Sequence, residues 1–109
     1  MGAKGAGEMI QKAALTWEGV SARPHRFGGT EYLLGSREIG HVHGDYLADI
    51  PFPTRVRDEL VEAGQAEPHH ILPKSGWVSC YIREDSDVEH AIMLLRRSYE
   101  IAVGQSKRR

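Results

Sequence analysis

Apolar side chains recur at intervals of three and four residues in three segments of the chain, 8–17, 54–63 and 86–104. This spacing is typical of an amphipathic helix that buries one face. The third segment has the longest stripe, and Ser86 followed by Glu89 forms a capping box at its start. The pattern therefore predicts three helices, each with one side against a core.

Between the helices lie short runs rich in strand-forming residues. The predicted strands cover residues 20–27, 30–34, 37–43, 46–52 and 77–83. Glycine-containing turn signals separate most of them, and Pro24 restricts the first run to an edge strand or irregular structure. Residues 65–74 fit either a short strand or an ordered loop. Short strands joined by tight turns predict an α+β fold, with helices packed on one face of an antiparallel sheet.

The length of 109 residues suits one domain, which we place at residues 8–104. Residues 1–7 contain three glycines and no large apolar side chain after Met1, so we expect a disordered N-terminal tail. Residues 105–109 follow Gly104 and end in Lys107, Arg108 and Arg109, which predicts a fraying basic tail. No internal repeat indicates a second unit.

Composition narrows the classes of partner. The net charge is -1 and the only run of basic residues is the C-terminal tail at 107–109, which we expect to be solvated, so the sequence gives no reason to expect nucleic acid binding. No apolar run approaches the ~20 residues that span a bilayer, so we expect no membrane partner. The single cysteine, Cys80, excludes an internal disulfide and suits a reducing cytoplasm, where we expect the protein to be located. Composition leaves the oligomeric state open.

The strongest chemical signal is the pair His41 and His43. Because side chains alternate along a strand, the two imidazoles should share one face, with Arg37 and Ile39 before them. Such a pair can supply two ligands to a divalent metal ion. A third ligand would come from His69, His70, Asp45 or Asp49.

A site without metal is the alternative chemical interpretation. His41 would act as general acid or base, oriented by Asp45, while Arg26 or Arg37 holds an anionic substrate. His41, His43 and Asp45 are therefore the candidate catalytic residues. A purely structural role for the hydrogen-bonded histidines is the simplest interpretation and stays open.

Other residues are candidates for binding a ligand. His69 and His70 lie between Pro68 and Pro73, which favours a rigid rim around a site. Trp77 would form a wall. Ser79 and Tyr81 would point into the pocket, opposite the core-facing Cys80. No glycine-rich phosphate loop, flavin cradle or nucleotide motif is recognisable. The candidate ligand-binding set is Arg26, Arg37, His69, His70, Trp77 and Tyr81.

Several short sequence motifs between residues 17 and 99 resemble those of a known protein family. They are Pro-His-Arg-Phe-Gly-Gly at 24–29, Arg-Glu-Ile-Gly-His-Val-His-Gly-Asp at 37–45, Leu-Ala-Asp-Ile-Pro-Phe-Pro at 47–53, Glu-Pro-His-His at 67–70, Ser-Gly-Trp-Val-Ser at 75–79 and Asp-Val-Glu-His-Ala at 87–91. In these motifs the chain resembles small bacterial luciferase-family proteins, also called luciferase-domain proteins. The resemblance supplies no catalytic residues. Its label suggests a light-emitting oxidation, which here would be cofactor-free or metal-assisted.

A more distant resemblance is to MmcQ/YjbR-type proteins. It rests on the order of Arg-Phe-Gly at 26–28, the helix at 54–63, the histidines before Trp77 and Arg-Ser-Tyr-Glu at 97–100. It implies a CyaY-like two-layer sandwich, in agreement with the predicted elements. We therefore expect a protein that binds a small molecule at a histidine-rich site on the exposed sheet face, with or without a metal. The alternative is a non-catalytic module that binds another protein, and whether there is turnover stays open.

Overall fold

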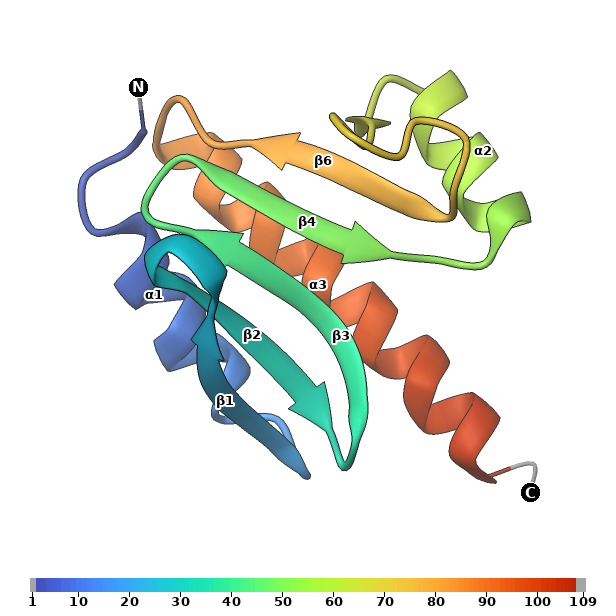
Figure 1. Ribbon diagram of the computed structural model, residues 1–109, viewed down its shortest axis with the longest axis horizontal. Helices are drawn as coiled ribbons and strands as arrows, with labels where there is room; N and C mark the ends of the chain where they lie inside the picture. Colours follow the sequence, from blue (N-terminus) through green and yellow to red (C-terminus); the bar gives the residue numbers. More distant parts are fainter. Residues whose placement is uncertain (1, 108–109) are drawn as a thin grey trace.

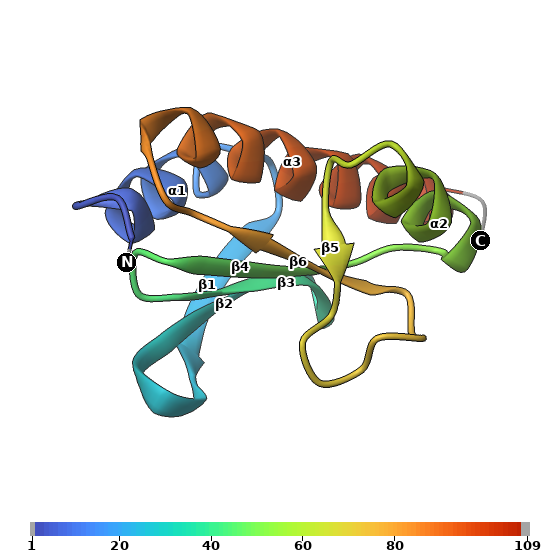
Figure 2. The same ribbon diagram turned by 90° about the horizontal axis from the view of Figure 1, so that it is seen from above.

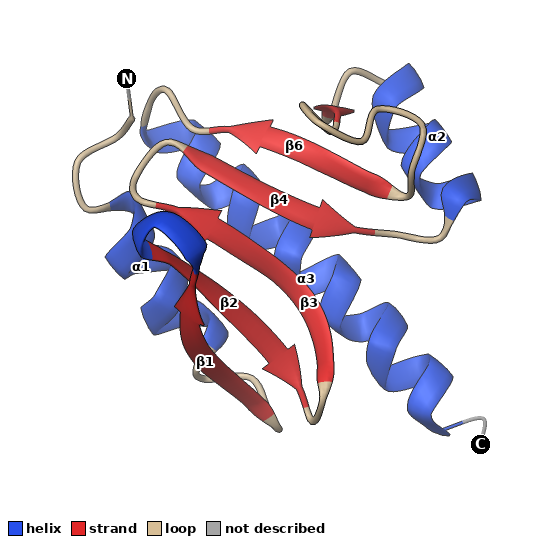
Figure 3. Cartoon of the chain, in the orientation of Figure 1, coloured by secondary structure: helices blue, strands red, loops and turns tan. Residues whose placement is uncertain are grey.

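The described strands form one antiparallel sheet in the order β1-β2-β3-β4-β6-β5 (Figure 1). The computed structural model describes residues 2–107. Its elements are α1 Ala6–Ala14, β1 Val20–His25, the 3-10 turn η1 Arg26–Gly28, β2 Gly29–Leu34, β3 Arg37–His43, β4 Leu47–Pro51, α2 Thr54–Glu62, β5 Glu67–Pro68, β6 Trp77–Tyr81 and α3 Asp85–Lys107. This arrangement confirms the predicted α+β class, and Figure 3 shows how the two kinds of element are distributed.

The three helices lie on the same side of the sheet (Figure 2). α3 provides the longest apolar stripe, and its buried side chains are Val88, Ala91, Leu94, Leu95, Ser98, Tyr99 and Ala102. The apolar members of this set pack in one core with Ile39 and Ile50 of the sheet, both fully buried. Since the helices cover one face, the other face of the sheet stays available for polar side chains.

A bulge in β3 changes which side chains share a face. Tyr32 pairs with Gly40 and Leu33 pairs with Glu38, so Ile39 is an extra residue without a partner. Ile39 is fully buried in the core, and Glu38 comes to lie beside His41. The prediction that Ile39 shares a face with His41 is therefore wrong, because a bulge interrupts the two-residue alternation.

The N-terminal residues are more ordered than their composition predicts. Ala3 is buried, its N–H donates to the Asp45 carbonyl, and α1 already begins at Ala6. The Asp45 carboxylate also accepts hydrogen bonds from the N–H groups of Gly5 and Gly7. Residues 3–7 are thus held against the β3–β4 turn rather than forming the expected tail, while Met1 lies outside the described residues. Small side chains allow this close backbone approach.

The C-terminal end also differs from its prediction. α3 continues through Gly104 to Lys107, and the predicted tail residues Arg108 and Arg109 lie outside the described residues. The ambiguous segment 65–74 contains the short edge strand β5 and then a loop that leads to β6. None of the described helices combines the length and apolar character needed to cross a membrane.

Candidate functional site

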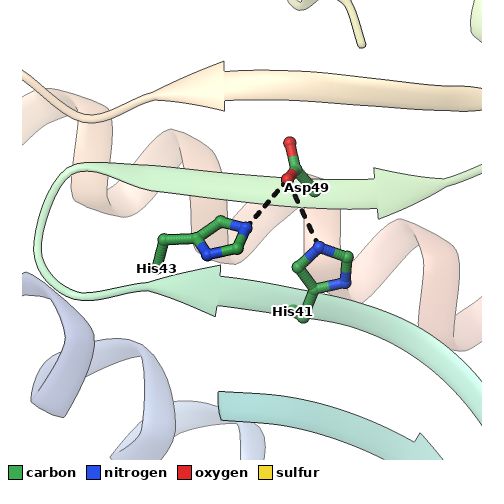
Figure 4. A group of neighbouring side chains, drawn as sticks. All are labelled: His41, His43 and Asp49. Carbon is green, nitrogen blue, oxygen red and sulfur yellow. Dashed lines mark hydrogen bonds and ion pairs between the residues drawn. The ribbon is translucent and has the colours of Figure 1, made fainter. Parts of the chain in front are cut away.

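Asp49 on β4 is the centre of the site. Its side chain is fully buried, and its Oδ1 accepts a hydrogen bond of 2.9 Å from the Ser79 hydroxyl. Its Oδ2 faces the Nε2 atoms of His43 at 3.1 Å, His70 at 3.1 Å, His41 at 3.3 Å and His69 at 3.5 Å. Figure 4 shows His41 and His43 pointing from β3 toward this carboxylate. Two separate segments therefore deliver imidazoles to one buried oxygen.

The strand register explains why these residues meet. His41 on β3 lies opposite Asp49 on β4, and Asp49 lies opposite Ser79 on β6. Directly opposite residues on neighbouring antiparallel strands project from the same face. The three residues thus form a row across the open face of the sheet, and His43 follows two positions along β3.

The loop after β5 brings the second histidine pair to this row. The His70 N–H donates to the Ser79 hydroxyl at 3.3 Å, which ties the loop to β6. His69 Nδ1 accepts hydrogen bonds from the N–H groups of Ile71 and Leu72 at 3.1 and 3.0 Å. Because Nδ1 accepts, the ring proton of neutral His69 must be on Nε2, where it points at Asp49. His69 therefore acts as a hydrogen-bond donor to the carboxylate.

His41 is held between two carboxylates. Its Nδ1–H donates to Glu38 Oε2 at 2.7 Å, and its Nε2 faces Asp49. Its ring stacks on His25 at a centroid separation of 4.2 Å, and His25 Nδ1–H donates to Glu31 Oε1 at 3.0 Å. Burial alone lowers the pKa of His41, but the hydrogen bonds to Asp49 and Glu38 outweigh it and raise that pKa to about 9.

The remaining charges follow from the same balance. Burial works to raise the pKa of Asp49, but hydrogen bonds from His41, His70 and Ser79 hold it well below its usual range. Burial lowers the pKa of His43 against the opposing pull of Asp49, and the nearby charges of His41 and His25 add to this effect. The pKa of His69 is lowered, chiefly by burial. At neutral pH the charged His41 imidazole thus lies beside the charged Asp49 carboxylate, with His43 and His69 neutral.

These side chains form the floor of an open pocket of about 520 Å³. The rim is largely apolar, and Ile71, Leu72 and Tyr46 are 71%, 52% and 50% exposed. Trp77 forms a wall beside His41, with ring centroids 5.1 Å apart. The complete lining is His25, Arg26, His41, His43, Tyr46, Leu47, Asp49, His69, His70, Ile71, Leu72 and Trp77.

The structure brings together most of the candidate residues from the sequence. His41, His43, His69, His70, Trp77 and Arg26 all line the pocket. Three others do not. Arg37 instead donates to Gln105 of α3, the Tyr81 ring lies under the Arg83 guanidinium, and the Asp45 carboxylate accepts the N–H groups at the start of α1. The aspartate of the site is therefore Asp49 and not Asp45.

Sequence reasoning undervalued several members of the site. Asp49 was only one of several possible metal ligands, and Glu38 was not considered. The sequence leaves His25 as either a second rim of the site or a solvated edge, and in the structure it lines the pocket and stacks on His41. Asp49 could have been found from the strand pairing across the β3–β4 turn. His43 pairs with Leu47 in this antiparallel hairpin, so the residue two positions before His43, His41, pairs with the residue two positions after Leu47, Asp49. Glu38 could not be found this way, since its position depends on the bulge.

In the comparison with known protein families, the luciferase-domain family model matches residues 36–98. This segment is more than half of the chain, and it contains Asp49 and the four histidines around it. The chain belongs to the luciferase-domain family. No curated protein and no solved structure matches it. The family match begins at residue 36, so His25 and Glu31 lie outside the matched part of this luciferase-domain protein.

Proposed function

We propose that this luciferase-domain protein binds a small, partly aromatic molecule in the pocket above Asp49. The observation that carries the proposal is the pairing of a polar imidazole floor with an exposed apolar rim. Tyr46, Ile71 and Leu72 are at least half exposed and surround the same opening. Large apolar groups gathered around a concave polar site are typical of ligand pockets.

The chemistry of the pocket favours a planar ligand with oxygen substituents. The Trp77 and His41 rings offer aromatic surface, and the imidazoles of the floor can donate or accept hydrogen bonds. Arg26 at the rim is a cation for an acidic group on the ligand. The volume of about 520 Å³ is in the range of pockets that hold one small molecule.

The proposal is tested with 8-anilinonaphthalene-1-sulfonate, an aromatic anion whose fluorescence rises in apolar surroundings. We expect Leu72→Ser and Ile71→Ser to weaken its binding by about 5- to 10-fold each, because each removes apolar contact worth about 1 kcal/mol. Met93→Ser is the matched control, since Met93 is 53% exposed on α3 and does not line the pocket. Equal affinity in all these variants and the unaltered protein would place the probe elsewhere and count against the proposal.

A protein-interaction module is the second candidate, because an exposed apolar rim also suits a protein partner. In that case a panel of aromatic acids would give no thermal shift, while Ile71→Ser and Leu72→Ser would abolish co-purification of one defined partner. Met93→Ser would again leave that complex intact. A thermal shift that depends on the rim residues would favour the small molecule instead.

A further inference from the structure

The Oδ2 atom of Asp49 faces more ring nitrogens than it can accept hydrogen bonds from. Four Nε2 atoms lie within 3.5 Å of it, whereas one carboxylate oxygen offers about two lone-pair sites. Asp49 is fully buried, and within residues 2–107 neither it nor Glu38 forms an ion pair with lysine or arginine. Such a centre is better suited to a cation that accepts lone pairs than to hydrogen bonds alone.

We propose that His41 Nε2, His43 Nε2 and Asp49 Oδ2 bind one divalent first-row transition-metal ion. These three atoms lie within 4.8 Å of one another. Two ligand atoms at ~2.1 Å from a tetrahedral metal ion are about 3.4 Å apart. The separations of 3.3 and 3.1 Å between Asp49 Oδ2 and the two Nε2 atoms are close to this value, so the carboxylate oxygen already has the spacing to each imidazole that one shared ion requires.

The hydrogen bonds around two of the rings separate a ligand, His41, from a supporting residue, His69. Glu38 accepts the Nδ1–H of His41, so when a metal ion replaces the Nε2 proton of the charged ring, that proton is released to solvent and the Nε2 lone pair faces the metal position. His69 is the opposite case. Its Nδ1 accepts two backbone N–H groups, so its Nε2 carries the proton and donates to Asp49. His69 is therefore a positioning residue that supports Asp49.

The donor set indicates the class of metal. Two imidazoles and one carboxylate suit Zn²⁺, Fe²⁺, Mn²⁺ or Ni²⁺, and the one cysteine, Cys80, is buried with the core rather than in the pocket. Three protein ligands leave coordination positions open, and all three ligands line the pocket. The inference thus deepens the proposed small-molecule function: the ion could contact an oxygen of the bound molecule.

The test is a titration of the metal-stripped full chain with Co²⁺ and Zn²⁺, followed by visible absorption for Co²⁺ and by calorimetry for Zn²⁺. We expect one ion per chain. His41→Ala and His43→Ala should each weaken binding by more than about 100-fold, and Glu38→Gln by about 10- to 100-fold. His69→Gln should change affinity by less than about 5-fold, since the His69 nitrogen is not a ligand and the glutamine amide can still donate a hydrogen bond to Asp49.

His90→Ala is the matched control, because His90 on α3 donates to the Gln65 carbonyl and does not line the pocket. Far-UV circular dichroism checks that each variant is folded. The proposal is overturned if folded protein shows no saturable binding, or if the His41→Ala/His43→Ala double variant binds as tightly as the unaltered chain. The metal titration contains no organic ligand, and Leu72→Ser should keep the full affinity for the metal ion. The metal proposal and the small-molecule proposal can therefore fail independently of each other.

Discussion

Two aspartates four residues apart have unrelated roles in this protein. Asp49 is fully buried on β4 and gathers imidazoles around one oxygen. Asp45 lies in the preceding turn, where its carboxylate accepts the N–H groups of Gly5 and Gly7 at 3.2 and 2.8 Å. A carboxylate at the first turn of a helix satisfies free N–H groups and interacts favourably with the helix dipole. Residue type alone does not separate the two roles.

Asp45→Ala should therefore reduce stability and leave the pocket unchanged. We expect the free energy of unfolding to fall by about 1 kcal/mol in urea denaturation, because the start of α1 loses its acceptor. The affinities for Co²⁺ and for the fluorescent probe should stay within about 2-fold. Asp58→Ala is the control, since the Asp58 side chain is 65% exposed and pairs with its neighbour Arg57. A loss of metal binding in folded Asp45→Ala would return Asp45 to the candidate ligands.

At the scale of elements, the site depends on how irregular segments are fixed to regular ones. The β3 bulge is held by α3, because the Ser98 hydroxyl on α3 hydrogen-bonds the Ile39 carbonyl at 2.9 Å. The loop that carries His70 ends at Gly76, whose carbonyl accepts the Phe52 N–H at 3.0 Å. Both anchors join segments far apart in the chain, so the geometry of the site depends on the assembled fold.

Gly76 should tolerate no side chain. A Cβ at this position would lie 2.1 Å from the Phe52 carbonyl oxygen, a backbone atom that cannot move without disturbing the end of β4. We expect Gly76→Ala to lower the free energy of unfolding by about 1–3 kcal/mol. Gly104→Ala is the matched control. Gly104 lies within α3 with nothing within 4 Å of its Cβ position, so alanine should raise stability by about 0.5–1 kcal/mol. Thermal unfolding of both variants checks this; equal effects would contradict it.

At the scale of the whole molecule, the two faces of the sheet have different roles. The helix-covered face contributes the core that stabilises the fold, and the open face carries the pocket. Cys80 and Tyr32 belong to the buried core, while the imidazoles line the pocket. Burial raises the pKa of the Cys80 thiol to about 11 and that of Tyr32 to about 12. Both groups therefore stay neutral in the folded protein at neutral pH, and both should affect how the free energy of unfolding changes at alkaline pH.

We expect the free energy of unfolding to decrease as the pH rises from 9 to 11. The folded-state pKa of Cys80 lies above its usual value of 9.0, so the stabilisation is complete below pH 9 and is lost as the pH rises through about 11. The loss from this one group is about 2–3 kcal/mol at most. Urea denaturation at pH 8, 9.5 and 11 measures it, and Cys80→Ala should decline less steeply. Parallel curves for the two proteins would refute the assignment.

Local sequence patterns determined the elements of this protein and the residue types of its site. The β3 segment 37–43 is predicted with its observed bounds, and most of the predicted apolar stripe of α3 is buried, because each depends on side-chain periodicity within one segment. The pattern misses Leu94 and Ser98, which also face the core. The two histidine pairs were also recognised, and the structure places both in one pocket.

Only the tertiary structure decided which of these residues meet. The selection of Asp49 over Asp45, the placement of Glu38 beside His41 and the proton position on His69 all depend on contacts between distant segments. The ordering of residues 3–7 against the β3–β4 turn has the same origin. A bulge or a strand register is set by the packing of the whole sheet, and a shift of one residue reverses every side chain of a strand.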